Sequence, residues 1–220
     1  MNPRHILTCL FLVLLSAGIG VVPASAQWFV SGGMNRSDLG LNDVGTGFQV
    51  GGGEIRPLPG DSFDVVWSLE YVQRRASQPM IFDDPDRGPV FGDAEVTLGY
   101  LQPAAMLGWR LPLGGLLLRP YGGASIAVKI SENWEKPTGS TNRVYAYEDL
   151  DVMVHAGVTV GWRRLLVDVR GSWGVLEQVI DLDYDNAGGW GKADDALEGV
   201  KVPQAGDKSA GFQVGLGLTF

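Results

Sequence analysis

The feature that most constrains this chain is a strict alternation between apolar residues and small or polar ones. In Gly211–Phe220, every even position is Phe, Val or Leu, and the odd positions are Gly, Gln or Thr. The same period recurs in Phe63–Arg74, Leu150–Trp162 and Leu165–Val175. A period of two is typical of a β-strand whose two faces meet different surroundings. The chain is therefore expected to consist of two-faced strands.

Four weaker segments bring the expected number of strands to eight. They cover Trp28–Met34, Val44–Ile55, Val96–Leu111 and Leu118–Ile130. Pro103 and Pro120 each remove a hydrogen-bond donor from these segments, so we expect a bulge or a local break at each proline. The alternation also slips near Tyr100, which indicates a bulge there.

The polar face indicates which kind of sheet these strands build. In a soluble sandwich or barrel the apolar face packs inward and the interior needs bulky side chains. Here the opposite face carries Gly, Ser, Thr and charged residues, which are too small and too polar to fill a dry interior. We therefore expect an all-β protein, an eight-stranded antiparallel up-and-down transmembrane β-barrel with its apolar face toward lipid.

The lengths of the connections predict how such a barrel is oriented. Short connections (56–62, 112–117, 163–164) alternate with longer ones (35–41, 76–95, 132–149, 177–210). Outer-membrane barrels have short periplasmic turns and long extracellular loops. Two aromatic girdles are then expected at the two membrane interfaces. The periplasmic girdle would contain Trp28, Phe63, Trp109, Trp162 and Phe220, and the outer one Trp67, Tyr71, Trp173 and Phe212.

The first 26 residues have the pattern of a secretory signal peptide. Arg4 and His5 precede the apolar run Ile6–Leu15, and Ala24-Ser25-Ala26 supplies an A-x-A cleavage site. We expect cleavage after Ala26, export to the outer membrane of a Gram-negative bacterium, and a barrel domain that covers residues 27–220.

Composition excludes several other classes of protein. A formal net charge of −8 argues against nucleic acid as a partner, because a phosphate backbone requires a basic face. The single cysteine, Cys9, excludes a disulfide framework and a cysteine-ligated metal site. The glycine runs of the sequence are not followed by a helix, which a phosphate-binding loop requires. No cofactor is therefore expected.

Charged residues on the expected lumen face form the main candidate site. An eight-stranded barrel is about wide enough to be filled by its own side chains, so these charges predict a paired polar core. The alternative is a narrow channel for ions or small solutes. The expected lumen residues are Asp64, Glu70, Arg74, Arg110, Arg119, Lys129, Asp151, Asp168 and Arg170.

Two further motifs are weaker candidates. His155 is the one histidine after the signal segment, and a lipid-modifying enzyme would need it as a catalytic residue. However, Gly157 stands at the position where a His-x-Ser motif has serine. No enzyme is therefore expected. Asp181, Asp183 and Asp185 alternate in an acidic stretch and are weak candidates for a divalent cation. The acidic outer loops also suggest cation-bridged contact with lipopolysaccharide.

Several segments resemble the PorT-like outer-membrane β-barrel domain family, also described as a porin family. They are SLEYVQRRA (68–76), YLQPAAMLGWRL (100–111), RPYGGASIAV (119–128), HAGVTVGW with LLVDVRGSWGV (155–175) and VGLGLTF (214–220). Gln102 and Ala104 depart from the family pattern, which has an acid and a bulky apolar residue there. The resemblance implies an eight-stranded barrel without a defined activity. It also implies that the strand ending in Phe220 is recognised by the barrel-assembly machinery.

Overall fold

The computed structural model describes residues 26–39, 44–60, 62–84, 88–135, 140–141, 145–177, 179–181 and 208–220. The predicted signal segment and most of the acidic stretch with Asp183 and Asp185 therefore lie outside the described residues. No helix among the described residues is long and apolar enough to cross a membrane.

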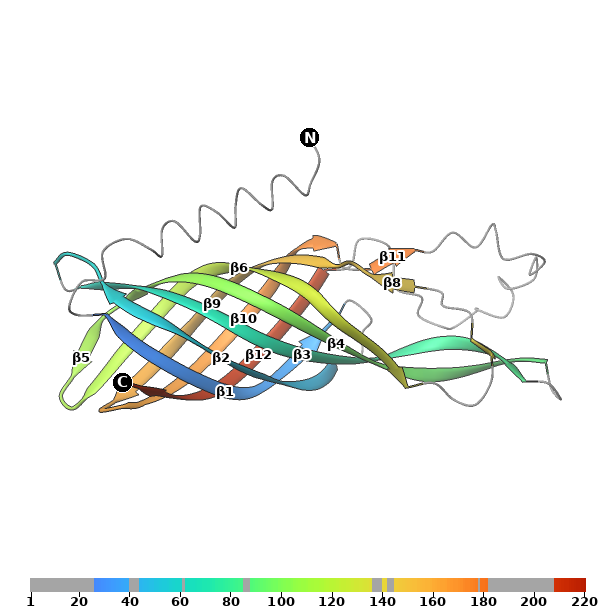
Figure 1. The fold of residues 1–220 in the computed structure, drawn as a ribbon, viewed down its shortest axis with the longest axis horizontal. Coiled ribbons are helices and arrows are strands. Elements are labelled where there is room, and N and C mark those ends of the chain that lie inside the picture. Colours follow the sequence, from blue (N-terminus) through green and yellow to red (C-terminus); the bar gives the residue numbers. More distant parts are fainter. Residues whose placement is uncertain are drawn as a thin grey trace, which may run out of the picture.

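Eight antiparallel strands close into a barrel (Figure 1). Each of the eight pairs with its neighbours in chain order, and the first pairs with the last, which confirms the expected fold. The barrel strands are β1 (Gln27–Asp38), β2 (Val44–Pro57), β3 (Phe63–Asp84), β4 (Gly88–Trp109), β6 (Leu116–Glu135), β9 (Leu150–Trp162), β10 (Leu165–Glu177) and β12 (Lys208–Thr219).

The register of these pairs fixes the tilt of the strands. Starting at Trp28, the paired positions around the barrel are Glu54, Trp67, Ala105, Ala124, Val154, Trp173 and Ala210, and the path returns to β1 at Asp38. The path has moved ten residues along β1, from Trp28 to Asp38. Ten residues of about 3.3 Å over eight spacings of about 4.8 Å give a tilt of about 40°. Moving one residue along a strand therefore advances about 2.5 Å along the barrel axis. Moving from a residue to its paired residue on the next strand advances about 3 Å.

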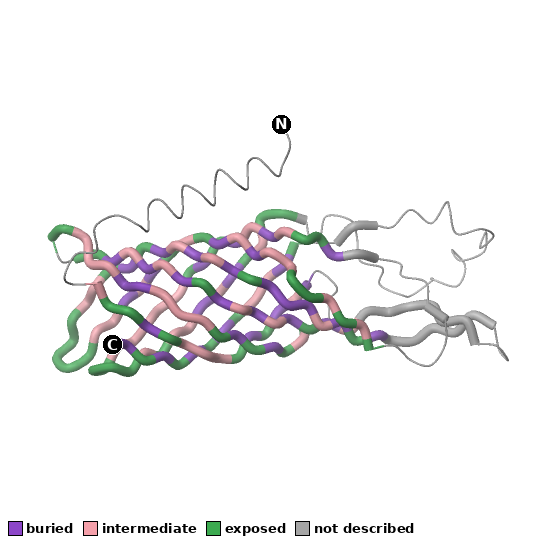
Figure 2. The backbone as a smooth tube through the Cα atoms, viewed as in Figure 1, coloured by how far each residue is buried: buried purple, intermediate pink, exposed green. Residues whose placement is uncertain are grey.

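Exposure follows the predicted alternation. On β12, Leu216 is 67% exposed and Phe220, just after the strand, is 70% exposed, whereas Gln213 and Thr219, which have the opposite parity, are 6% and 3% exposed. Buried and exposed positions alternate in this way along the barrel wall (Figure 2). The apolar face therefore points away from the lumen, and the polar face lines it.

The register places the outward-facing aromatic residues in two rings. Trp28, Phe63, Trp109, Trp162 and Phe220 fall within about 5 Å of one another along the axis, at the end with the short turns. Tyr71, Phe48, Phe212 and Trp173 lie about 16–19 Å above Trp28. We call these the inner and outer rings.

The prediction that Trp67 belongs to the outer ring is wrong. Trp67 is in register with Glu54, which pairs with Trp28. Two register steps place its axial position only about 6 Å above Trp28. In a tilted barrel, the four residues from Phe63 to Trp67 do not span the membrane.

Both prolines interrupt the pairing of β4 with β6, as predicted. Pairing stops at Leu101 and resumes at Ala104, on either side of Pro103. It stops again at Tyr121 and resumes at Leu118 with the short strand β5 (Leu111–Leu113), on either side of Pro120. The register also shifts between Gly99 and Tyr100, which confirms the predicted bulge.

The expected long loop 76–95 is wrong, because most of this segment is a β-hairpin. β3 and β4 remain paired from Ser77 with Glu95 to Asp84 with Gly88, and the hairpin extends beyond the barrel (Figure 1). Short strands lie on the same side: β7 (Ser140–Thr141) pairs with β3, and β8 (Tyr145–Tyr147) pairs with β11 (Val179–Asp181). The hairpin was missed because its residues do not continue the alternation of the barrel wall.

Candidate functional site

An ion-pair cluster lies in the lumen at the end with the short turns. Asp64 on β3 is fully buried, and its Oδ2 accepts from Arg119 Nε at 2.6 Å. Arg110 Nε lies 3.4 Å from Asp64 Oδ1 and its side chain is 30% exposed. Arg119 therefore neutralises Asp64 inside the barrel, and Arg110 does so from the opening.

Arg170 on β10 is the centre of the next layer. Its guanidinium contacts both carboxylate oxygens of Glu70, at 3.0 and 3.3 Å, and Nη2 lies 3.4 Å from Asp168 Oδ2. Arg170 Nε donates to the Tyr121 hydroxyl at 3.1 Å, and that hydroxyl donates to Asp168 at 2.8 Å. Ser68 donates to Glu70 at 3.0 Å. One network of charges and hydroxyls thus joins β3, β6 and β10 across the lumen.

His155 lies above this layer, between two serines. Its Nδ1 is 2.8 Å from Ser172 Oγ, and its Nε2 is 2.7 Å from Ser125 Oγ. Nε2 is also 3.5 Å from Gln102 Nε2. Both ring nitrogens are therefore occupied by neutral partners, and His155 is buried in the lumen, on the face opposite to lipid.

A second buried ion pair crosses the upper lumen. Arg74 Nη1 lies 3.2 Å from Asp151 Oδ2, and Ser209 donates to the same oxygen at 2.7 Å. Arg74 also stacks on the ring of Tyr100, with its Cζ 4.6 Å from the ring centroid. This group joins β3, β4, β9 and β12.

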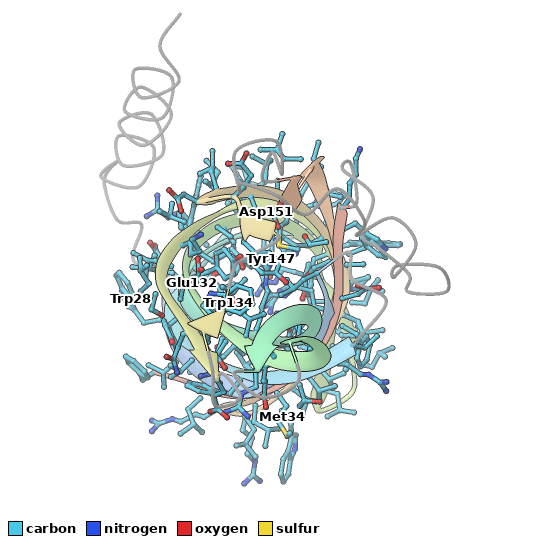
Figure 3. The ribbon with its side chains drawn as sticks, turned by 90° about the vertical axis from the view of Figure 1, so that its right-hand side faces the viewer. Trp28, Met34, Glu132, Trp134, Tyr147 and Asp151 are labelled. Atoms are coloured by element: carbon cyan, nitrogen blue, oxygen red, sulfur yellow. The ribbon has the colours of Figure 1, made fainter. Side chains whose placement is uncertain are left out.

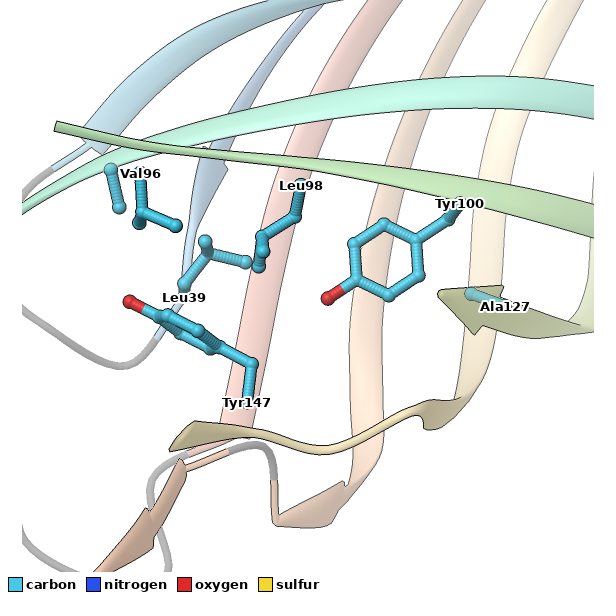
Figure 4. Packing of buried hydrophobic residues seen from close by; sticks show 7 residues of the cluster. Leu39, Val96, Leu98, Tyr100, Ala127 and Tyr147 are labelled. Carbon is cyan, nitrogen blue, oxygen red and sulfur yellow. The ribbon is translucent and has the colours of Figure 1, made fainter. Parts of the chain in front are cut away.

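An apolar cluster lies at the outer end of the lumen (Figure 4). Each member is nearly inaccessible to solvent, and Tyr147 reaches the cluster from β8, outside the eight barrel strands. Burial raises the pKa of the Tyr147 hydroxyl well above its ordinary value, so the hydroxyl stays protonated. We call this group the outer plug: Leu39, Ala76, Val96, Leu98, Tyr100, Ala127 and Tyr147.

Lys129 connects the outer plug to the barrel wall through a hydrogen bond and ion pairs. Its Nζ donates to the Tyr147 carbonyl at 2.6 Å and forms ion pairs with Glu132 at 2.8 Å and Asp149 at 3.1 Å. Trp134 donates to Glu132 at 2.7 Å and packs against Tyr147. Figure 3 shows Glu132, Trp134 and Tyr147 inside the ring of strands, with Trp28 and Met34 outside it.

Small spaces lie between these layers. A cavity of about 50 Å³ lies between the apolar side chains of Phe29, Ile55 and Met106 and the polar network of Arg170 and Asp168. A second of about 20 Å³ is lined by Asn35, Arg74 and Gln213, among others. Spaces of this size hold a few water molecules.

The structure arranges the nine predicted lumen residues in separate groups. Seven form the buried or half-buried pairs described above, whereas Arg110 lies at the opening and Lys129 binds acids that were not in the predicted set. Tyr121, Ser209 and the outer plug were missed. Tyr121 and Tyr100 are aromatic residues on the polar face of their strands, and that departure from the alternation could have revealed them.

No group of three or more His, Cys, Asp or Glu side chains converges on a possible metal position within the described part of the chain. Of the three candidate aspartates, Asp181 ends β11, where it pairs with Tyr145. The other two lie outside the described residues.

Comparison with known proteins supports the fold at low sequence identity. A major outer membrane protein from Thermus thermophilus is 14% identical, with a TM-score of 0.50 over 89% of this chain and 100% of that one. The outer membrane enzyme PagL is 12% identical (TM-score 0.47, 86% and 98% covered). Ail, the attachment invasion locus protein of Yersinia pestis, is 13% identical (TM-score 0.46, 89% and 99% covered). No family model and no curated protein matches the sequence. The first similarity supports the architecture of an outer-membrane β-barrel and carries no activity.

Proposed function

We propose that this protein is an integral outer-membrane β-barrel with a closed lumen, and that its role lies at the cell surface. The β3–β4 hairpin carries this proposal. Its paired backbone from Ser77 to Asp84 projects by about 25 Å past the barrel. A paired hairpin that continues past the ends of the neighbouring strands offers a surface for contact with other molecules.

The lumen favours a non-conducting barrel over the alternative of a narrow channel. The Arg170 network, the Arg74–Asp151 pair and the outer plug obstruct it at three successive heights. Wider barrels with open lumens are the ones that conduct. A steady conductance in planar bilayers that changes on Arg170→Glu would favour the channel.

A lipid-modifying enzyme is the weaker alternative. Catalysis by His155 would require an accessible nucleophile and an orienting acid, but its two serines are buried and both ring nitrogens are used by them. We propose that His155 connects neighbouring strands of the barrel wall through its hydrogen bonds to the two serines. Changed lipid A or phospholipid on expression, lost with His155→Ala, would favour the enzyme.

We also propose membership of the PorT-like family, cleavage of residues 1–26, and recognition of the last strand by the barrel-assembly machinery. Phe220 ends a face of exposed apolar residues on β12 and hydrogen-bonds to β1, with its N–H donating to the Trp28 carbonyl at 3.0 Å. β12 is thus the strand that closes the barrel by pairing with β1. Before closure its apolar face would be available for recognition by the barrel-assembly machinery.

Labelling of intact cells tests the surface location of the hairpin. In a background with Cys9→Ser, Asp84→Cys at the hairpin end is expected to react with a membrane-impermeant maleimide in whole cells. The control Arg164→Cys, exposed in the β9–β10 turn at the other end of the barrel, should react only after the outer membrane is opened. Labelling in the reverse order would contradict the proposed orientation.

A further inference from the structure

The outward face of β1, β2 and β3 changes from mainly apolar to mainly polar, with two arginines, just above the outer ring. Met34 on β1 is exposed and pairs with Phe48 on β2, whose ring lies 5.7 Å from that of Tyr71 on β3. Two residues further along β1, the next outward side chain is Arg36. Along β3, the outward side chains that follow Tyr71 are Gln73 and then Arg75.

Arg36 and Arg75 flank a hydroxyl on the strand between them. Arg36 pairs with Thr46, and Gly45 packs so closely against the Arg75 carbonyl that a Cβ there would collide with it. Two strand spacings separate the arginines laterally by about 10 Å. Arg36, Thr46 and Arg75 lie about 20, 23 and 26 Å above Trp28 along the axis. Both guanidinium groups can thus reach one ligand positioned over Thr46.

The two arginines keep their positive charge available. Arg36 is exposed and forms no ion pair with any described residue. Arg75 Nη1 lies 3.6 Å from Glu95 Oε1, with the two side chains 48% and 47% exposed, and such an exposed pair contributes little. Asp38, the next outward residue on β1, is partly buried and has other interactions. The site therefore retains donors for an anion.

The opposite wall is still apolar at this height. Its outward side chains about 20–26 Å above Trp28 are Val128, Leu150, Val152 and Val175. On a barrel surrounded by lipid, headgroups begin where the apolar wall and its aromatic ring end. On the wall formed by β1, β2 and β3 the mainly apolar face ends below Arg36 and Arg75, so we place these two residues at the lower edge of the outer headgroup layer, on one side of the barrel only.

We infer that Arg36, Thr46 and Arg75 form an outward-facing binding site for a phosphate group of lipid A, the membrane anchor of lipopolysaccharide. Arginine is suited to this ligand because its planar guanidinium donates two parallel hydrogen bonds to phosphate oxygens. The acyl chains would then lie along Met34 and Phe48, below the arginines. This inference rests on the proposed outer-membrane location and deepens it, because it gives direct contact in place of the cation-bridged contact expected from the acidic loops.

Binding of lipid A to the full protein in nonionic detergent tests this site. The double variant Arg36→Ala/Arg75→Ala is expected to bind bisphosphorylated lipid A about tenfold or more weakly than the wild type, as follows from losing charged hydrogen bonds. The matched control Arg163→Ala/Arg164→Ala removes two exposed arginines at the other end of the barrel and should bind like the wild type. Fully dephosphorylated lipid A should bind all three proteins equally weakly, and inorganic phosphate should not displace the glycolipid.

Two results would overturn the inference: wild-type affinity in the Arg36/Arg75 double variant, or equal binding of phosphorylated and dephosphorylated lipid A. Displacement by inorganic phosphate would identify a free-anion site and overturn it as well. Heat-modifiable migration in gel electrophoresis shows for each variant that the barrel has closed. Because binding is measured in detergent, its failure is distinct from failure of the proposed location, which the hairpin labelling in whole cells tests separately.

Discussion

Replacing Arg170 with alanine is expected to lower the free energy of unfolding of the barrel by about 3–5 kcal/mol, the range for breaking a buried ion pair. The substitution leaves Glu70 and Asp168 in the lumen without their guanidinium. Unfolding by urea in lipid vesicles, followed by tryptophan fluorescence, measures the loss.

The matched control is Arg75→Ala, because its ion pair with Glu95 is half exposed. Its expected loss is below about 1 kcal/mol. The double variant Arg170→Ala/Glu70→Ala should recover part of the stability lost with Arg170→Ala, since one unpaired buried charge is then removed. Equal losses for Arg170→Ala and Arg75→Ala would contradict the account of a charge-paired lumen.

Replacing Leu216 with arginine is expected to cost about 2–4 kcal/mol when the barrel is embedded in a bilayer. Leu216 is 67% exposed on the outward face of β12, and it lies about 7 Å above Trp28, close to the midpoint between the two aromatic rings. A charge at this depth is surrounded by acyl chains.

The control for Leu216→Arg is Ala210→Arg on the same face of β12. Ala210 lies about 22 Å above Trp28, at the outer interface, where the expected cost is about 0–1 kcal/mol. Urea unfolding in vesicles gives both values. A barrel whose apolar face did not contact lipid would show no dependence on depth, and equal costs at the two positions would contradict the assignment.

Alternation alone predicted which residues face the lumen, because in a strand the side-chain direction is fixed by parity. The exposed Leu216 and the buried Gln213 show this on β12. Pro103, Pro120 and Tyr100 also marked the irregular pairing of β4 with β6, because a missing donor and a slip in alternation are both visible locally.

Whether a residue has an odd or even number in its strand does not determine its position along the barrel axis. Most of the features that the sequence did not predict depend on that axial position. The shift of ten residues around the barrel depends on the pairing of all eight strands, so Trp67 was assigned to the wrong level. For the same reason the charged residues of the lumen could be predicted from the sequence, but the ion pairs of Arg170 with Glu70 and of Arg74 with Asp151 could not. The outer plug was missed because Tyr147 reaches it from a segment outside the barrel strands.

The central claim is that the apolar outer wall contacts acyl chains while the polar face is enclosed, and quenching of tryptophan fluorescence by brominated lipid tests it most directly. A variant retaining only Trp67 and a variant retaining only Trp134 would be reconstituted into vesicles whose acyl chains carry bromine near the bilayer centre. Trp67 lies on the outward face, about 6 Å above Trp28, and Trp134 packs inside the barrel mouth against Tyr147. Strong quenching of Trp67 with little quenching of Trp134 is the predicted result; a protected Trp67 would contradict the claim.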